Sequence, residues 1–174
     1  MVRRNVAGLL AVDFFTQGYR ISGYINTRAR TVGDILNDKL VSYVELNEVY
    51  ISRISNPGEI VGTYPDAQLH KNGLLFAVVP AKERLSKAGR ATSYFGKSLR
   101  RVWLALPGIE IEADFEVTGL TLDWKAYLAK AVSDYIAFVN GVARVISSPE
   151  ITFSGEAVLV NREYIDLFCM EDDS

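Results

Sequence analysis

Hydrophobic and polar residues alternate along several stretches of this chain, and the stretches come in two similar sets. The alternating residues lie at 12–14, 19–25, 102–104 and 109–117. A glycine separates the two stretches of each set, Gly18 in the first and Gly108 in the second. Alternation with a period of two is typical of a strand that buries one face. We therefore predict that each half of the chain begins with two strands joined by a turn.

The two sets align when the sequence is shifted against itself by 90 positions. Gly18 then falls on Gly108, and Ile21 falls on Ile111. In the middle of each half the offset drifts to 92 and 93 positions, where Tyr43 matches Tyr135. Matched alternation and matched turns in the same order predict an internal duplication. We place the first unit at residues 1–80, a basic flexible connector at 81–101, the second unit at 102–170 and an acidic tail at 171–174.

A short helix is expected after the second strand of each unit. In the first unit, Thr31 and Asp34 resemble a capping box, followed by an apolar stripe that reaches Leu40. In the second unit, Thr121 is the expected N-cap of a helix whose apolar face begins at Trp124. These helices are predicted to cover one end of a sheet.

Further strands are expected at 43–54 and 60–63 in the first unit and at 135–146 and 151–153 in the second. A final hairpin is predicted to turn at Lys71-Asn72-Gly73 and at Asn161-Arg162-Glu163, because Asn and Gly tolerate a positive φ. The predicted fold class is mainly β (α+β). It has two similar small, strongly bent β-sheet or barrel units of β-β-α-β-β-β order.

The final strand, Asn-Gly turn and strand resemble the second motif of Sm-like (Lsm/Hfq-type) small β-barrels. Residues 23–25 followed by Asp34-Ile-Leu-Asn37 are similar to the first motif of that family. The resemblance implies a tandem of small barrels and RNA binding. In the RNA-binding members, however, the Asp and the Asn are one residue further apart than Asp34 and Asn37. The second unit has Ala126 and Ala129 at the equivalent places, so no RNA pocket is implied there.

Charge is segregated along the chain. The net charge is +1 over residues 1–80, +6 over 81–103 and −9 over 104–174. Candidate partner-binding residues therefore lie in the connector: Lys82, Arg84, Lys87, Arg90, Tyr94, Phe95, Lys97, Arg100 and Arg101. They are expected to pair with the acidic second unit, to bind nucleic acid by gripping phosphates and stacking bases, or to contact an anionic membrane surface.

Four carboxylates occupy alternate positions after Gly108, namely Glu110, Glu112, Asp114 and Glu116. Alternate positions of a strand share one face, so the carboxylates are expected on one side, with Ile109, Ile111, Ala113 and Phe115 buried on the other. A row of carboxylates either holds a hard cation such as calcium or forms the solvated face of the strand. We favour the solvated face, because a calcium site needs converging loops.

Candidate chemistry is sparse. His70 is the only histidine and Cys169 the only cysteine. Neither stands in a recognisable catalytic or zinc-binding pattern, and no phosphate-binding loop is present. We therefore expect no enzymatic activity, no cofactor and no metal. A lone cysteine cannot form an internal disulfide, and no apolar stretch is long enough to span a membrane, which favours a cytoplasmic location.

These observations predict a non-catalytic structural, assembly or adaptor protein that contacts other protein chains through tandem units, with homo-oligomers as one possibility. The alternative is an RNA-binding or single-strand-binding protein that uses the basic connector and the Sm-like fold. An anionic membrane surface is the least favoured partner.

Overall fold

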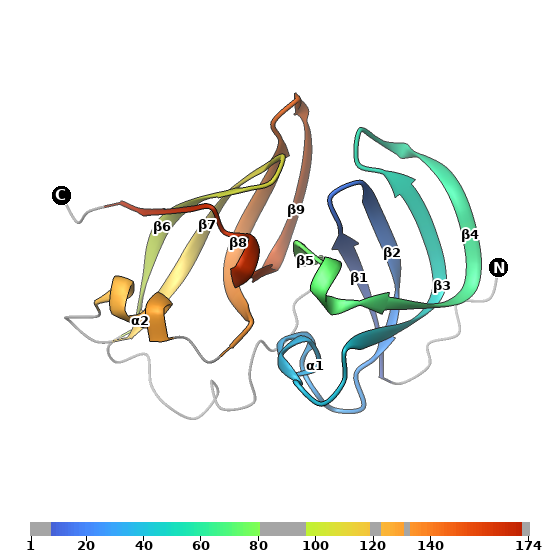
Figure 1. Ribbon diagram of the computed structural model, residues 1–174, viewed down its shortest axis with the longest axis horizontal. Helices are drawn as coiled ribbons and strands as arrows, with labels where there is room; N and C mark the ends of the chain where they lie inside the picture. The colour runs from blue at the N-terminus through green and yellow to red at the C-terminus, as the bar shows by residue number, and fades with distance from the viewer. Residues whose placement is uncertain (1–7, 81–96, 119–122, 131–132, 172–174) are drawn as a thin grey trace.

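The computed structural model describes residues 8–80, 97–118, 123–130 and 133–171, which form one antiparallel sheet of ten strands (Figure 1). The order of strands across the sheet is β10-β6-β7-β8-β9-β5-β1-β2-β3-β4. The first-half strands are β1 (Leu9–Phe15), β2 (Tyr19–Asn26), β3 (Tyr43–Arg53), β4 (Asn56–His70) and β5 (Phe76–Val79). The second-half strands are β6 (Lys97–Leu106), β7 (Ile109–Thr118), β8 (Tyr135–Val145), β9 (Ser148–Asn161) and β10 (Leu167–Met170).

The predicted fold class is wrong. The described residues are nearly all β, with 67% in strands and 12% in helices, and their single sheet does not close. It is therefore not an α+β protein of separate barrel units, because β5 of the first half hydrogen-bonds directly to β9 of the second. Within the part of the chain that the structure describes, the two α-helices, α1 (Val32–Asn37) and α2 (Trp124–Lys130), are too short to form a covering layer.

The two halves place corresponding residues at corresponding positions of the sheet. Val12 pairs with Gly23 between β1 and β2, and Val102 pairs with Ala113 between β6 and β7. Both halves also interrupt their next strand pair with a bulge. A non-glycine residue with positive φ lies at each of these bulges, Glu48 in β3 and Asn140 in β8. The bulges increase the local twist and bend each half.

The predicted strands 43–54 and 135–146 match β3 and β8, whereas β4 and β9 are far longer than expected. The predicted final hairpins are wrong. β4 pairs with β3, while β5 leaves it and pairs with β1 and β9. The connecting residues form short 3₁₀ turns, η1 (Lys71–Gly73) and η3 (Arg162–Tyr164). Neither Asn72 nor Gly73 adopts a positive φ, so the Asn-Gly pair makes no hairpin turn here.

The capping box of α1 is confirmed. The Thr31 side chain accepts a hydrogen bond from the Asp34 backbone N–H, and the Asp34 carboxylate accepts one from the Thr31 N–H. The predicted stripe extends too far, because Leu40 lies beyond the helix and is 95% exposed. Thr121 lies outside the described residues; at the start of α2 it is the Asp123 side chain that accepts the Lys125 and Ala126 backbone N–H groups.

The sheet passes between two hydrophobic cores, and β5 and β9 contribute to both. Phe76 and Val78 point into the core of the second half, whereas Ala77 and Val79 point into the core of the first. β9 alternates in the same way: Val158 and Val160 face the second-half core, and Ala157 and Leu159 face the first-half core. All four residues of β5 are therefore buried. The two halves share their cores across this strand pair.

Candidate assembly interface

The contact between β5 and β9, which we call the internal joint, is where one half of the chain adds a strand to the other. Four residue pairs join the strands in antiparallel register, from Phe76 opposite Val160 to Val79 opposite Ala157. The Phe76 ring also stacks on Phe15, with the ring centroids 4.4 Å apart. Phe15 in turn packs against Phe153 of β9, with a centroid distance of 4.6 Å. The internal joint thus combines backbone pairing with an aromatic cluster, a strong form of strand addition.

Side-chain hydrogen bonds fix one end of the internal joint. Asn161 donates its backbone N–H to the Leu75 carbonyl and its side-chain Nδ2 to the Leu74 carbonyl, both at 2.9 Å. The Tyr135 hydroxyl donates to the Lys71 carbonyl at 2.6 Å. These buried donors and carbonyls satisfy one another only in this register, because a slip of one residue would leave them unpaired.

Further polar contacts cross from α1 and η1 to the second half. The Asn37 side chain accepts the Tyr135 backbone N–H at 2.8 Å and donates to the Tyr135 carbonyl at 3.3 Å. The Tyr164 hydroxyl donates to the Asn72 carbonyl at 2.6 Å. The Sm-like resemblance placed Asn37 in an RNA motif. Here its side chain instead joins the two halves through two hydrogen bonds to the Tyr135 backbone.

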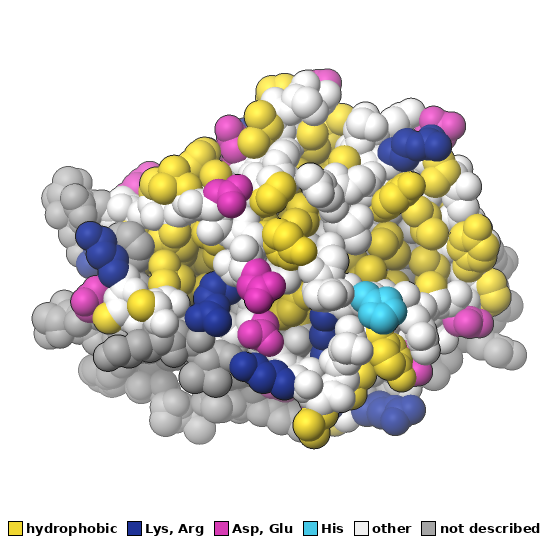
Figure 2. Space-filling model, in the orientation of Figure 1, with side chains coloured by type: hydrophobic (Ala, Val, Ile, Leu, Met, Phe, Trp, Pro, Cys, Tyr) yellow, Lys and Arg dark blue, Asp and Glu magenta, His cyan; other side chains and the backbone are white. Residues whose placement is uncertain are grey.

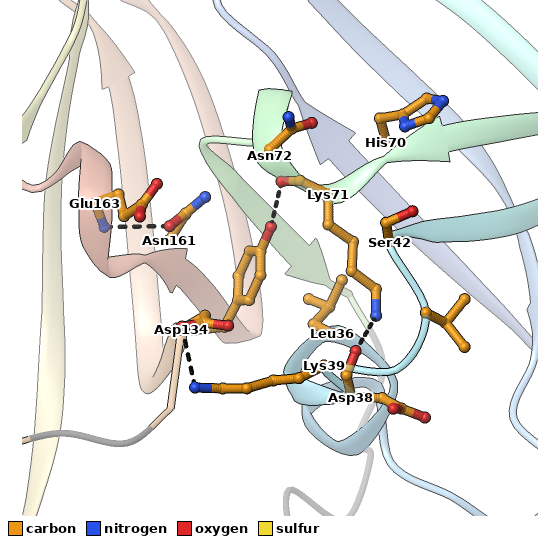
Figure 3. Close-up of a pocket in the computed structure, with 12 residues that line it drawn as sticks. Leu36, Asp38, Lys39, Ser42, His70, Lys71, Asn72, Asp134, Asn161 and Glu163 are labelled. Carbon is orange, nitrogen blue, oxygen red and sulfur yellow. Dashed lines mark hydrogen bonds and ion pairs between the residues drawn. The ribbon is translucent and has the colours of Figure 1, made fainter.

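A cleft of about 550 Å³ lies beside the internal joint and is lined by residues of both halves (Figure 3). Lys71 is one of the lining residues and is only 8% exposed; its side chain runs toward Asp38, and its Nζ donates to the Asp38 carbonyl at 2.9 Å. Burial lowers the pKa of Lys71, although the nearby Asp38 carboxylate opposes this effect. Burial also raises the pKa of the Tyr135 hydroxyl, which keeps its proton in the hydrogen bond to Lys71.

The lowered pKa of Lys71 predicts a pH dependence of stability. Between its lowered pKa in the folded protein and its usual pKa of 10.5, the Lys71 amine holds its proton more tightly in the unfolded chain than in the folded protein. The free energy of unfolding should therefore rise as the pH increases over this range. Lys71→Met removes this dependence. The stability of the variant relative to wild type should therefore be greater near pH 7 than near pH 9.5, as measured by urea unfolding.

Lys39→Met is the matched control, because the Lys39 side chain is 60% exposed and only approaches Asp134 at 3.9 Å. It controls for the loss of one lysine charge from the same region. A Lys71→Met difference that changes with pH no more than the Lys39→Met difference would contradict the expected result.

The two edge strands of the sheet are β4 and β10. Among the described residues, β4 pairs only with β3 and β10 only with β6. Large hydrophobic side chains are exposed on β4 at Ile60, Val61 and Tyr64, and on β10 at Leu167. Hydrophobic side chains reach the surface over both halves in the view of Figure 2. Edges with unpaired backbone groups and exposed apolar side chains are templates for a further strand.

One hydrogen bond shows which backbone N–H groups of β4 point away from β3. Lys71 donates its N–H to Ser42, on the β3 side. Because N–H groups alternate in direction along a strand, those of His70, Gln68 and Asp66 point away from β3. In β9, Asn161 stands at the place that His70 holds in β4, and its N–H is the one donated to Leu75 across the internal joint. The edge of β4 thus presents the same donors that β9 uses.

The connector residues predicted to bind partners are divided by the structure. Lys82, Arg84, Lys87, Arg90, Tyr94 and Phe95 lie outside the described residues. Lys97, Arg100 and Arg101 belong to β6, so the strand begins inside the predicted flexible connector. Arg101 approaches Asp114 at 3.2 Å and Glu112 at 3.4 Å, which confirms the predicted pairing with the acidic strand for this residue.

The carboxylate row also lies where the alternation predicted. Ile109, Ile111, Ala113 and Phe115 are buried in the second-half core. On the other face, Arg144 of β8 stands 4.0 Å from both Glu110 and Glu112. Arginines from the two neighbouring strands therefore neutralise much of the row.

His70 and Cys169 lie on the two edge strands, at opposite ends of the strand order, and both are exposed. Within the part of the chain that the structure describes, no three His, Cys, Asp or Glu side chains are grouped so that they could hold a metal ion. In that same part, none of the helices is both long and apolar enough to cross a membrane.

Sequence reasoning missed the internal joint and the outward N–H groups of β4. The available signal was the unbroken apolar run from Leu74 to Val79, which is typical of a strand buried on both faces. No known protein-family model matches this chain, and neither the curated proteins nor the solved structures contain a match to it. The resemblance to Sm-like proteins therefore stays a prediction.

Proposed function

We propose that this protein is a non-catalytic assembly component that binds other protein chains by strand addition at the free edges of its sheet. The observation that carries the proposal is the edge of β4, where the N–H groups of Asp66, Gln68 and His70 point outward and no described strand covers them. Strand addition uses such main-chain donors for affinity and the adjacent side chains for specificity.

The internal joint supports this proposal. There, the same kind of edge in β9 accepts β5, and the pairing buries every residue of the added strand. If the chain arose by duplication, as we propose, the edge of β4 inherits the geometry of the β9 edge. The part of β4 from Asp66 to His70 contains no proline and no register shift against β3, two devices that commonly protect an edge from partners.

A proline at Gln68 tests the proposal directly. Gln68→Pro removes one outward N–H but no hydrogen bond to β3, so the fold should persist, because proline is tolerated on an edge strand. Tagged wild-type protein, Gln68→Pro and Gln68→Ala would be purified from the native cells and their bound chains compared. We expect chains that are retained by wild type and Gln68→Ala to be lost from Gln68→Pro.

Circular dichroism and urea unfolding must first establish that Gln68→Pro is folded like Gln68→Ala. Retention of the same bound chains by folded Gln68→Pro, or their absence from all three samples, would contradict strand addition at this edge.

Nucleic-acid binding through the basic connector is the second proposal. It ranks below assembly because Arg101, one of its expected phosphate ligands, is engaged by Glu112 and Asp114. The carboxylate row beside it would also repel a phosphate backbone.

A further inference from the structure

We propose that the partner of the β4 edge is a second copy of this chain, whose β10 adds to β4 in the register of the internal joint. This inference rests on the proposed function and names the occupant of its edge. The copies would join head to tail, with β10 of one molecule in the role that β5 plays for β9. Such heterologous contacts leave one free edge at each end and can continue from copy to copy.

The register follows from the sheet. Val78 pairs with Asp13 of β1, and Cys169 pairs with Trp103 of β6. Asp13 and Trp103 are themselves equivalent, because each follows the matched residues Val12 and Val102. Cys169 therefore stands in β10 where Val78 stands in β5.

The acceptor strands align in the same way. Tyr43 pairs with His70 and Tyr135 pairs with Asn161, so His70 of β4 is equivalent to Asn161 of β9. Counting back along each strand makes Ala67 equivalent to Val158, which is the residue opposite Val78. The intermolecular pairs are then Leu167 with Leu69, Phe168 with Gln68 and Cys169 with Ala67.

The side chains of β10 alternate as those of β5 do, but a hydrophobic core covers only one face of β10. Phe168 and Met170 pack against the core of their own half, as Ala77 and Val79 of β5 do. The residues on the other face of the two strands differ in burial. Phe76 and Val78 are buried in the core of the neighbouring half, whereas Leu167 is 52% exposed and Cys169 is exposed. The outward face of β10 thus carries the residues that would fill the core of a further half.

The core of the first half is open at the matching place. Ile111 and Ala143, which lie in the second-half core that receives β5, are fully buried. Their equivalents Ile21 and Ile51 are only partly buried at the margin of the first-half core. Ala67 is likewise partly buried, where its equivalent Val158 is fully buried. Burying Leu167 and Cys169 of a second copy against these residues would complete the core.

Polar groups that fix the internal joint have counterparts at the edge of β4. Tyr43 is equivalent to Tyr135, and His70 to Asn161. A hydroxyl and a ring N–H therefore stand where the internal joint uses a hydroxyl and an amide. Their acceptors would be the carbonyls of Arg162 and Ile165 in the second copy, which are equivalent to those of Lys71 and Leu74.

One difference between β4 and β9 limits the length of the intermolecular pairing. Tyr64 stands at the place of Gly155, where a Cβ would lie 2.7 Å from the Val79 carbonyl oxygen. The Tyr64 ring leans over Gly62, the equivalent of Phe153. A side chain at this place conflicts with the residue of β10 equivalent to Val79, which is Met170. The pairing should therefore stop at Cys169.

Cysteine cross-linking tests this register, because Cys169 is the only native cysteine. In the internal joint Asn161 bonds to Leu75, so Val158 and Val78 form a non-hydrogen-bonded pair, whose Cα atoms are typically about 4.5 Å apart. That separation suits a disulfide. We expect tagged Ala67→Cys/Cys169→Ser protein, mixed with untagged wild type under mild oxidation, to form a mixed disulfide between the introduced cysteine of the tagged chain and Cys169 of the untagged one.

Gln68→Cys/Cys169→Ser is the matched control, because residue 68 points to the opposite face of β4. It should give less than a tenth of the mixed disulfide, with both variants first checked for native circular dichroism. Equal or absent cross-linking for the two variants would overturn the second copy as partner. If bound chains of another kind are still lost from Gln68→Pro, strand addition at β4 stands while self-assembly falls.

Discussion

Phe76→Ala is expected to lower the free energy of unfolding of the whole chain by about 3–5 kcal/mol, the range for removing a fully buried aromatic ring. Phe76 is completely buried and stacks on Phe15 with an angle of 5° between the ring planes. Because the ring fills the second-half core from a first-half strand, both halves should lose stability together. Urea unfolding followed by circular dichroism and by tryptophan fluorescence measures this, since both tryptophans lie in the second half.

Leu167→Ala is the matched control, because Leu167 holds the equivalent place in β10 and is half exposed. At concentrations where the protein is monomeric its effect should stay within about 0.5 kcal/mol, as for most surface substitutions. A Phe76→Ala protein in which the second-half tryptophans unfold at the wild-type urea concentration would contradict the shared core.

The strands that bury one face could be predicted from sequence, because their alternation is a local property. The buried series from Ile109 to Phe115 lies as expected, with the carboxylates opposite. The capping box at Thr31 is equally local, since its partners are three residues apart. In each case the predictive signal comes from residues a few positions apart, so the pattern alone predicts the local structure.

The single sheet could not be predicted in this way, because the pairing that creates it joins residues about 80 positions apart. The run from Leu74 to Val79 shows no alternation, and the preceding Asn72-Gly73 favoured a local hairpin. Its strongly apolar residues instead cross to β9, because each face of β5 can be buried in a different core. Tertiary packing here overrides the turn preference of two residues.

The candidate interface was even harder to predict from the sequence. An edge is defined by which strands remain unpaired, and this depends on the order of the whole sheet rather than on any residue in β4. Charge gave a partial guide, since it predicted the contacts of Arg101 with the acidic strand. It pointed to residues of the connector, whereas the outward donors of β4 belong to Asp66, Gln68 and His70, which no sequence feature distinguishes.

The close approach of β9 to β5 depends on a glycine. Gly155 lies just beyond the last residue pair of the internal joint, and a Cβ there would be 2.5 Å from Val78 Cγ1 and 2.7 Å from the Val79 carbonyl oxygen. The valine side chain has little room to turn away, because Val78 is buried. The carbonyl belongs to the backbone and can move only if β5 moves with it. An added methyl group must therefore push the two strands apart.

We expect Gly155→Ala to lower the free energy of unfolding by about 3 kcal/mol, the upper part of the range for overpacking a tight core. Gly18→Ala is the matched control, because a Cβ at Gly18 meets no atom within 4 Å. It should leave stability within about 0.5 kcal/mol of wild type. Since the strain in Gly155→Ala falls on β5, hydrogen exchange should also become faster at the amides of Ala77 and Val79. A variant as stable and as well protected as Gly18→Ala would mean that the strands can separate freely, and that the halves do not depend on their shared cores.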